Sequence, residues 1–291
     1  MALAGVQRPY RLYIIDGTGP SDDNDYASSM RNSFCNQLDA ACGPSAFYAR
    51  GPTNPGFELM SLAAAAVNWL GAQKQALPEA RIMLAGYSRG ATAAILAARH
   101  LRPRRIDVDA LFLFDAVLMQ TQLAAHTLTS NIRHAYHIMR PSPDVADHRG
   151  LIGKYEGTIL DEVWDIGEAG GWTLGRKANP FRPDWGNCGR MVEDPARTAF
   201  QSMRLGIGTH GALGGVGWNG VERDEEAQAL VAKWMNAYLA LQGLPACLKS
   251  LPPMARLPSV GMQTVPEMIE ERGRKRKPSK LPVETVRRPK Y

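Results

Sequence analysis

One short segment restricts the fold of this chain more than any other part of the sequence. Arg81–Ala85 is an apolar run typical of a buried strand, and Gly90–Leu101 is an alanine-rich run typical of a helix. Gly86–Gly90 (GYSRG) joins them, so the strand must turn sharply into the helix. Glycines two positions on either side of a serine suit such a turn, because strand and helix approach too closely there for side chains. The segment predicts a serine that a strained turn presents to substrate, with a tight turn opening an ordinary helix as the alternative.

Strand-like and helix-like segments alternate through the first half of the chain. Short apolar runs predict strands, and longer runs rich in alanine and leucine predict helices. Further strands are expected at Arg11–Asp16, Ser45–Arg50, Val108–Asp115 and Ala135–Met139, and further helices at Ala27–Leu38 and Glu58–Gln75. This order favours an α/β fold with a mostly parallel central sheet and helices on both faces. Such sheets carry their sites at the carboxyl ends of the strands.

The regular pattern fades over residues 141–202, where Gly, Trp and Pro are frequent. A long irregular insertion in an α/β domain is typical of a cap over a substrate site, and a mobile connection is the alternative. A last strand is expected at Met203–Gly208 and a closing amphipathic helix at Glu222–Leu241. We therefore expect one domain over residues 1–245, with a cap-like insertion at about 141–202, and a proline-punctuated tail over 246–291.

The positive charge of the chain is concentrated in this tail. The formal net charge is +6, but residues 272–291 hold nine Lys or Arg and one Glu, so the rest carries about −2. The body is thus near neutral, and a chain with 45% hydrophobic residues overall is typical of a globular protein. No apolar run reaches the roughly 18 residues that a membrane span needs, and the first residues do not resemble a secretory signal peptide. We expect a protein that is cytoplasmic as synthesised and exported, if at all, by another route.

The serine predicts a set of partners elsewhere in the chain. A serine hydroxyl is a weak nucleophile and needs a general base that is oriented by an acid. Asp115 closes an apolar strand, so its carboxylate is expected beside Ser88; capping of a following helix is its alternative role. His210 follows the last expected strand in a glycine-rich segment, and on a flexible loop it can swing over the serine. We predict Ser88 as nucleophile, Asp115 as acid and His210 as base.

Other histidines, and the cysteines, are candidates for related chemistry. His134, His137 and His148 remain alternative bases; the first two flank an expected strand, so ordinary core or edge residues are their alternative role. No histidine or cysteine spacing suits a metal site, so neither a metal nor another cofactor is expected. The cysteines are expected to be free thiols, with a disulfide between the first two as the alternative: Cys35, Cys42, Cys188 and Cys247.

The negatively charged intermediate of acyl transfer needs backbone N–H donors. One is expected from Arg89, the residue after the nucleophile, and a second from Gly17 or Thr18 in the loop after the first strand. A plain turn is the alternative for this loop, as is a phosphate-cradling loop, although no nucleotide-binding pattern accompanies it. Tyr87 and Trp172 are the candidate substrate-binding residues.

Four segments together resemble a known family. Tyr13–Gly19, Gly86–Ala91, Leu113–Val117 and Gly208–Gly215 look like the signatures of the DUF2235-type α/β-hydrolases. These signatures are a strand ending in DGT, a GFSRGA turn, a strand ending in DTV and a G-x-H-S-D-V-G-G loop. They occur here in the same order, and the likeness covers about residues 11–220.

The resemblance implies an α/β-hydrolase fold with Ser88, Asp115 and His210 as the catalytic residues. The family includes phospholipase effectors of bacterial type VI secretion, so the likeness implies an acyl ester as substrate, phospholipid first. This chain departs from the pattern where Tyr87 replaces Phe, Ala116 replaces Thr, and Gly-Ala follows the histidine in place of Ser-Asp. A soluble ester, a thioester or a polymer ester is the alternative substrate, and a non-catalytic scaffold is the alternative function.

The basic tail suggests partners of its own. Its densest cluster is a run of four charges: Arg274, Lys275, Arg276 and Lys277. Such a cluster binds anionic lipid headgroups at about 1 kcal/mol per basic residue near a charged bilayer. Nucleic acid is disfavoured because no aromatics are interleaved with the charges, and a solvated tail without a partner is the alternative. The effector resemblance adds a cognate inhibitor protein or a secretion component as expected partners.

Overall fold

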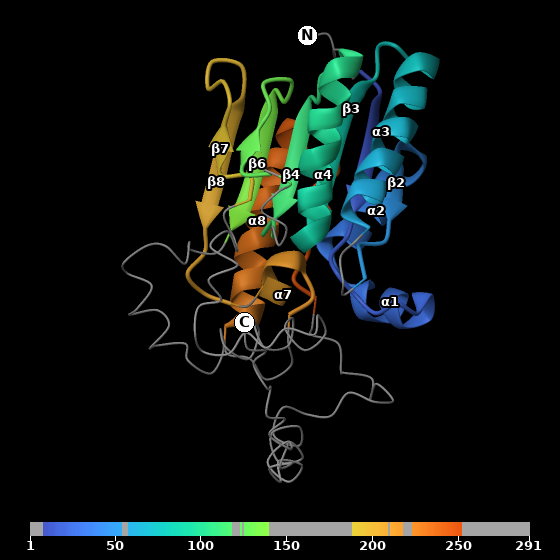
Figure 1. Ribbon diagram of the computed structural model, residues 1–291. Coiled ribbons are helices and arrows are strands. Elements are labelled where there is room, and N and C mark those ends of the chain that lie inside the picture. Colours follow the sequence, from blue (N-terminus) through green and yellow to red (C-terminus); the bar gives the residue numbers. More distant parts are fainter. Residues whose placement is uncertain are drawn as a thin grey trace, which may run out of the picture. The chain divides into compact units, whose positions relative to one another are not determined.

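The computed structural model describes residues 8–53, 58–117, 123, 125–139, 188–208, 210–217 and 223–251. The chain divides into a unit Met1–Met254 and a second unit Ala255–Tyr291, and every described residue belongs to the first. The first unit is built around one sheet with helices packed against it (Figure 1).

The main sheet is parallel, as predicted. Its six strands follow the order β2-β1-β3-β4-β6-β8, and all five pairings between them are parallel. The strands are β1 (Tyr10–Ile15), β2 (Ala46–Ala49), β3 (Arg81–Tyr87), β4 (Ala110–Phe114), β6 (His134–Met139) and β8 (Ala199–Arg204). A separate pair joins β5 (Thr127–Leu128) to β7 (Met191–Val192). Because the strands of the main sheet run the same way, their carboxyl ends meet at one edge.

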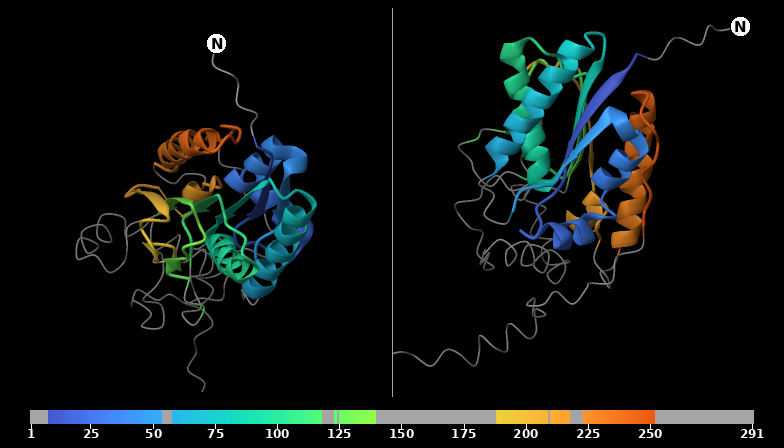
Figure 2. Two further views of the ribbon diagram at one scale, coloured as in Figure 1. Left: turned by 90° about the horizontal axis from the view of Figure 1, so that it is seen from above. Right: turned by 90° about the vertical axis from the view of Figure 1, so that its right-hand side faces the viewer.

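Helices cover both faces of this sheet (Figure 2). One face packs against α3 (Leu59–Ala76) and α4 (Ser88–Leu101). The other packs against α2 (Phe34–Cys42) and α8 (Asp224–Leu241). The central strands are therefore buried on both sides, which is why their sequences are continuous apolar runs rather than alternating ones. This is the α/β-hydrolase arrangement, as the sequence predicted.

The first strand shows how neighbouring side chains divide between the two cores. Tyr13 and Ile15 join the core beneath α3 and α4, whereas Leu12 and Ile14 join the core beneath α2 and α8. Successive side chains of a strand point to opposite faces, so both faces of β1 are apolar. The strands of the main sheet all end at one edge, and α1 (Asp23–Met30) and α7 (His210–Gly214) lie at that edge (Figure 1).

Two predicted elements differ from the structure. The single helix expected at Ala27–Leu38 is two helices: α1 ends at Met30, and Ser33 caps α2 by accepting a bond from the Asn36 amide. The last strand, expected at Met203–Gly208, is β8 at Ala199–Arg204. Four residues of the proposed cap-like insertion therefore belong to the sheet, and residues 140–187 lie outside the described part of the chain.

The domain extends past its predicted end at residue 245. Leu248 is buried in the core beside α8, and its amide donates to Asn236 of that helix. No helix within the described residues is both long enough and apolar enough to cross a bilayer. The four cysteines all lie in the described part of the chain and form no disulfide there.

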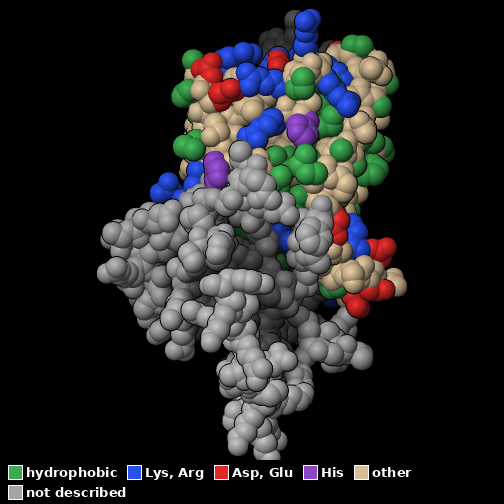
Figure 3. Space-filling view, in the orientation of Figure 1, with side chains coloured by type: hydrophobic (Ala, Val, Ile, Leu, Met, Phe, Trp, Pro, Cys, Tyr) green, Lys and Arg blue, Asp and Glu red, His purple; other side chains and the backbone are tan. Residues whose placement is uncertain are grey.

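Charged side chains on the face seen in Figure 3 form a mostly acidic group around α1 and a second group at the end of the sheet where the strands begin. Two ion pairs on exposed side chains belong to this end, Arg102 with Glu193 at 2.9 Å and Arg133 with Asp107 at 2.9 Å. Both pairs lie at the end of the sheet opposite to its carboxyl edge. The predicted site residues are found at the carboxyl edge. Exposed pairs of this kind contribute about 0–1 kcal/mol each.

Candidate active site

Ser88 occupies the strained turn that the sequence predicted. It begins α4 directly after β3, and its φ of 56° lies in the left-handed region, which non-glycine residues rarely adopt. A Cβ on Gly86 would lie 2.7 Å from the Ala91 backbone, and one on Gly90 would lie 2.0 Å from the Asp16 carbonyl oxygen. Both glycines are therefore required for α4 to approach β3 and β1 this closely.

The structure brings Ser88, His210 and Asp115 together in a hydrogen-bonded relay. The Oγ of Ser88 lies 2.7 Å from Nε2 of His210, and Nδ1 of His210 lies 2.7 Å from Oδ2 of Asp115. Asp115 is fully buried, and Ser88 and His210 are 6% and 3% exposed. This is the geometry in which an imidazole takes the serine proton while a carboxylate fixes its orientation.

Asp115 lies at the tip of a tightly held turn, here called the acid turn (Asp115–Val117). Its φ is 43°, also in the left-handed region, which Asp tolerates better than most residues. The Asp115 amide donates to the Ile138 carbonyl at 2.7 Å, and the Val117 amide donates to the Ser88 carbonyl at 3.1 Å. The second bond joins the acid turn directly to the turn of the nucleophile.

Neither His134 nor His137 reaches the serine. His137 is fully buried and both of its ring nitrogens face backbone groups, the Ala116 amide and the Gly189 carbonyl. His134 begins β6, and is therefore at the opposite end of the sheet from Ser88. His148 lies outside the described residues.

His210 is held more rigidly than the sequence suggested. We expected a flexible loop, but His210 begins the short helix α7 and is buried. The ring of Tyr87 lies against its imidazole with centroids 4.9 Å apart, and the Tyr87 hydroxyl donates to the His210 carbonyl at 3.1 Å. Tyr87 therefore packs against His210 and helps to hold it in place. Because Tyr87 is only 4% exposed, it has little surface for the predicted substrate contact.

One of the predicted oxyanion donors is already engaged. The Gly17 amide donates to the carboxylate of Asp16 at 2.7 Å, so it is not directed at a substrate. The Arg89 amide lies in the first turn of α4, where backbone N–H groups point out of the helix end, and the Arg89 and Thr18 amides stay predicted donors. The Arg89 side chain fixes this loop, because its Nε donates to the Thr18 hydroxyl at 2.6 Å and its Nη2 to the Thr53 carbonyl at 2.9 Å.

Asp16 anchors the same loop from beneath. Besides the Gly17 amide, its carboxylate accepts bonds from Ser33 Oγ at 2.5 Å, Tyr48 OH at 2.9 Å and Asn36 Nδ2 at 3.4 Å. Burial raises the pKa of the Asp16 carboxyl to about 6, and the bonds from Ser33, Gly17 and Tyr48 oppose that rise. The charged form is thus held by neutral donors on three separate elements.

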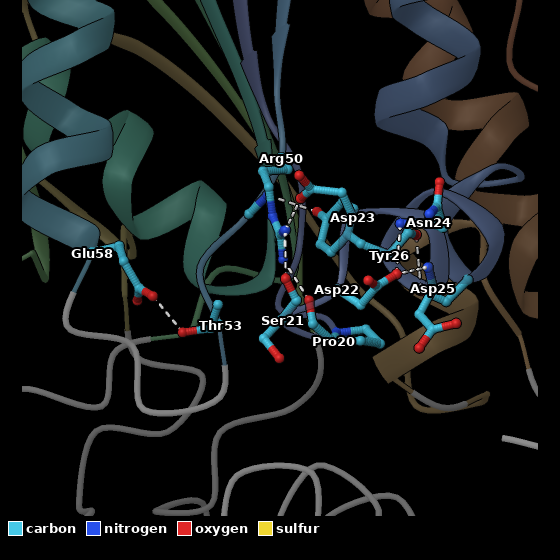
Figure 4. A network of polar contacts seen from close by, with 12 residues as sticks. Pro20, Ser21, Asp22, Asp23, Asn24, Asp25, Tyr26, Arg50, Thr53 and Glu58 are labelled. Carbon is cyan, nitrogen blue, oxygen red and sulfur yellow. Dashed lines mark hydrogen bonds and ion pairs between the residues drawn. The ribbon is translucent and has the colours of Figure 1, made fainter. Parts of the chain in front are cut away.

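Tyr26 and Arg50 complete the support of this loop (Figure 4). The Tyr26 hydroxyl donates to the Gly17 carbonyl at 2.8 Å and accepts from the Gly51 amide at 2.6 Å. Arg50 stacks over the Tyr26 ring at 4.4 Å, donates to the Ser21 carbonyl at 3.1 Å and pairs with Asp23. Tyr26 and Arg50 therefore hold the loop after β1 by hydrogen bonds to its backbone, and the loop is not a plain turn.

Sequence reasoning missed these supporting residues. Asp16 was visible only as the residue before a glycine-rich turn, and the side chain of Arg89 only as a family feature, since their partners are distant in the sequence. Trp172 and the basic cluster at 274–277 lie outside the described residues. Within the part of the chain that is described, no three His, Cys, Asp or Glu side chains gather as metal ligands would.

Comparisons with known proteins identify no family for the chain. No family model and no curated protein matches it. Among solved structures, a RedJ thioesterase of prodiginine biosynthesis from Streptomyces coelicolor is 17% identical, with 78% of this chain and 86% of that one covered and a TM-score of 0.32. YbtT, a type II thioesterase of the yersiniabactin pathway, is 14% identical, with 83% and 95% covered and a TM-score of 0.32.

A cutinase-like protein from Cryptococcus sp. is 16% identical, with a TM-score of 0.26. The match covers 46% of this chain and spans about half of the cutinase-like one, 54%. At such identities and TM-scores, the function has to be argued from the geometry of the site itself.

Proposed function

We propose that this protein is a serine hydrolase that cleaves carboxylic esters through an acyl-enzyme intermediate. The observation that carries the proposal is the unbroken relay from Ser88 through His210 to Asp115, with 2.7 Å at each contact. A non-catalytic scaffold has no need to hold a serine at a φ of 56° within hydrogen-bond distance of a buried histidine.

Each residue has one part in the reaction. Ser88 Oγ attacks the ester carbonyl carbon while Nε2 of His210 takes the hydroxyl proton. The resulting oxyanion is stabilised by the amides of Arg89 and Thr18, and its collapse expels the alcohol, which receives the proton from His210. Water, deprotonated by His210, then attacks the acyl-enzyme and releases the acid, which restores the serine.

Asp115 makes this proton transfer directional. With its carboxylate on Nδ1, the imidazole carries its proton there and presents the lone pair of Nε2 to Ser88. The same carboxylate stabilises the imidazolium that forms during attack. Because Asp115 is fully buried, water does not compete for this bond.

Phospholipid is the proposed substrate class, and the likeness to phospholipase effectors in four motifs supports it. The basic cluster Arg274–Lys277 supports it independently, since an enzyme acting at anionic bilayers gains residence time from a polybasic segment. On the same likeness we propose delivery by a type VI-like route. Soluble esters and thioesters are the alternatives, because the same triad cleaves them.

A substrate panel tests the proposal. Purified full-length protein is assayed with short-chain soluble esters, an acyl thioester and vesicles containing anionic phospholipid, beside Ser88→Ala as the matched control. Release of fatty acid from vesicles by the wild type, lost in Ser88→Ala, supports a phospholipase. Turnover of soluble esters or thioesters alone removes phospholipid from the proposal, and no Ser88-dependent turnover of any substrate contradicts the hydrolase itself.

A further inference from the structure

One buried histidine has no part in the reaction described above. His137 lies in β6 with no exposed surface. Its Nε2 lies 3.2 Å from the Ala116 amide nitrogen, and its Nδ1 lies 3.2 Å from the Gly189 carbonyl oxygen. Ala116 directly follows Asp115, so this ring contacts the backbone of the acid turn.

The two partners of the ring fix its protonation. A backbone amide can only donate and a carbonyl can only accept, so Nε2 must carry the lone pair and Nδ1 the proton. Burial lowers the pKa of His137 to about 4, although the nearby Asp115 charge opposes this, so the ring is neutral at pH 7. A protonated ring would set two donors face to face at Ala116 and lose that bond.

The three amides of the acid turn are held by two elements, β6 and α4. Asp115 donates to β6 backbone, Val117 to the carbonyl of Ser88, and Ala116 to the ring of His137. The ring of His137 is the one side chain among these three acceptors, since the other two are backbone carbonyls. It lies next to a residue whose left-handed φ needs support from its surroundings.

We propose that His137 is a positioning residue, which orients the Asp115 carboxylate toward His210 by holding the Ala116 amide. The proposal rests on the catalytic role assigned to Asp115 above. It gives His137 a kinetic effect without substrate contact, because a small misplacement of a catalytic group lowers the rate steeply.

Two substitutions separate the bond to Ala116 from the bond to Gly189. In His137→Asn, the side-chain amide reaches only as far as the position of Nδ1 in the wild-type ring. It can therefore keep the bond to the Gly189 carbonyl but loses the bond to the Ala116 amide. The amide of His137→Gln reaches as far as Nε2 and can restore the acceptor. His134→Gln, on the same strand but at its other end, is the matched control.

We expect His137→Asn to lower kcat roughly 10- to 100-fold with KM nearly unchanged, and His137→Gln to recover most of the loss. Two readouts report on orientation rather than on folding: the pH profile of kcat/KM, and the far-downfield proton resonance of the His210 Nδ1–H bound to Asp115. Both should change in His137→Asn and return toward wild type in His137→Gln.

Equal kinetics and an unchanged resonance in both variants, whatever their stability, would overturn the proposal. A wild type without turnover would contradict the hydrolase instead. The resonance then still decides between the two His137 variants, since it reports the His210–Asp115 bond without any substrate. If His137→Asn does not fold, a normal resonance and rate in the folded variant His137→Leu, which has no acceptor, would overturn the proposal equally.

Discussion

Replacing Asp115 by Asn tests the relay at its most buried member. Asn is nearly the same size and tolerates the left-handed φ of 43°, so the fold should survive. Its amide nitrogen, however, can donate to Nδ1 of His210, which places the imidazole proton on Nε2. At 2.7 Å from Ser88 Oγ, that nitrogen then has no lone pair to accept the serine proton.

The expected loss is large because the wrong tautomer is held in place by buried partners. We expect kcat to fall about 10⁴-fold, equivalent to about 5.4 kcal/mol of transition-state stabilisation. The assay is turnover of a chromogenic short-chain ester, with Ser88→Ala as the floor and urea unfolding to verify that the variant is folded. A folded Asp115→Asn with less than about a tenfold loss would refute the assignment of Asp115 as the acid.

Three further substitutions follow from particular contacts. Tyr87→Phe removes the hydroxyl bond to His210 but keeps the stacked ring, so we expect about 1 kcal/mol lower stability by urea unfolding and kcat within a few-fold of wild type. Gly90→Ala should lower stability by at least about 2 kcal/mol, since its Cβ would lie 2.0 Å from a backbone oxygen, whereas Gly206→Ala, with open space, should change it little. Asp16→Asn removes a carboxyl whose pKa is about 6 when folded and near 4 when unfolded. Wild type should therefore lose about 2 kcal/mol of stability relative to the variant as the pH rises from 4 to 7, measured by unfolding at each pH. If wild type and Asp16→Asn differ in stability by the same amount at both pH values, the buried charge of Asp16 is contradicted.

The residues of the relay could be predicted because each follows a strand or opens a helix. Parallel strands end at one edge, so a serine after β3 and an aspartate after β4 had to be neighbours. The pattern around Gly86 and Gly90 specified a close approach of helix and strand, and the structure shows the backbone atoms that demand it.

What the sequence did not reveal depends on contacts between distant segments. The orientation of the Asp16 side chain, which takes the Gly17 amide away from the substrate, is fixed by Ser33 and Tyr48 on other elements. Ser33 also caps α2 by accepting from the Asn36 amide, which is why the helix expected at Ala27–Leu38 is two helices. Tyr87 looked like a substrate contact because it neighbours Ser88, but the strand directs its ring under His210.

The most direct test of the central claim is covalent labelling of the nucleophile. A fluorophosphonate probe reacts with a serine only where a base activates it, so intact-protein and peptide mass spectrometry should find one adduct, on Ser88. Labelling should be absent in Ser88→Ala and strongly slowed in Asp115→Asn. A wild type that is folded and remains unlabelled, or that is labelled at another serine, would contradict the account.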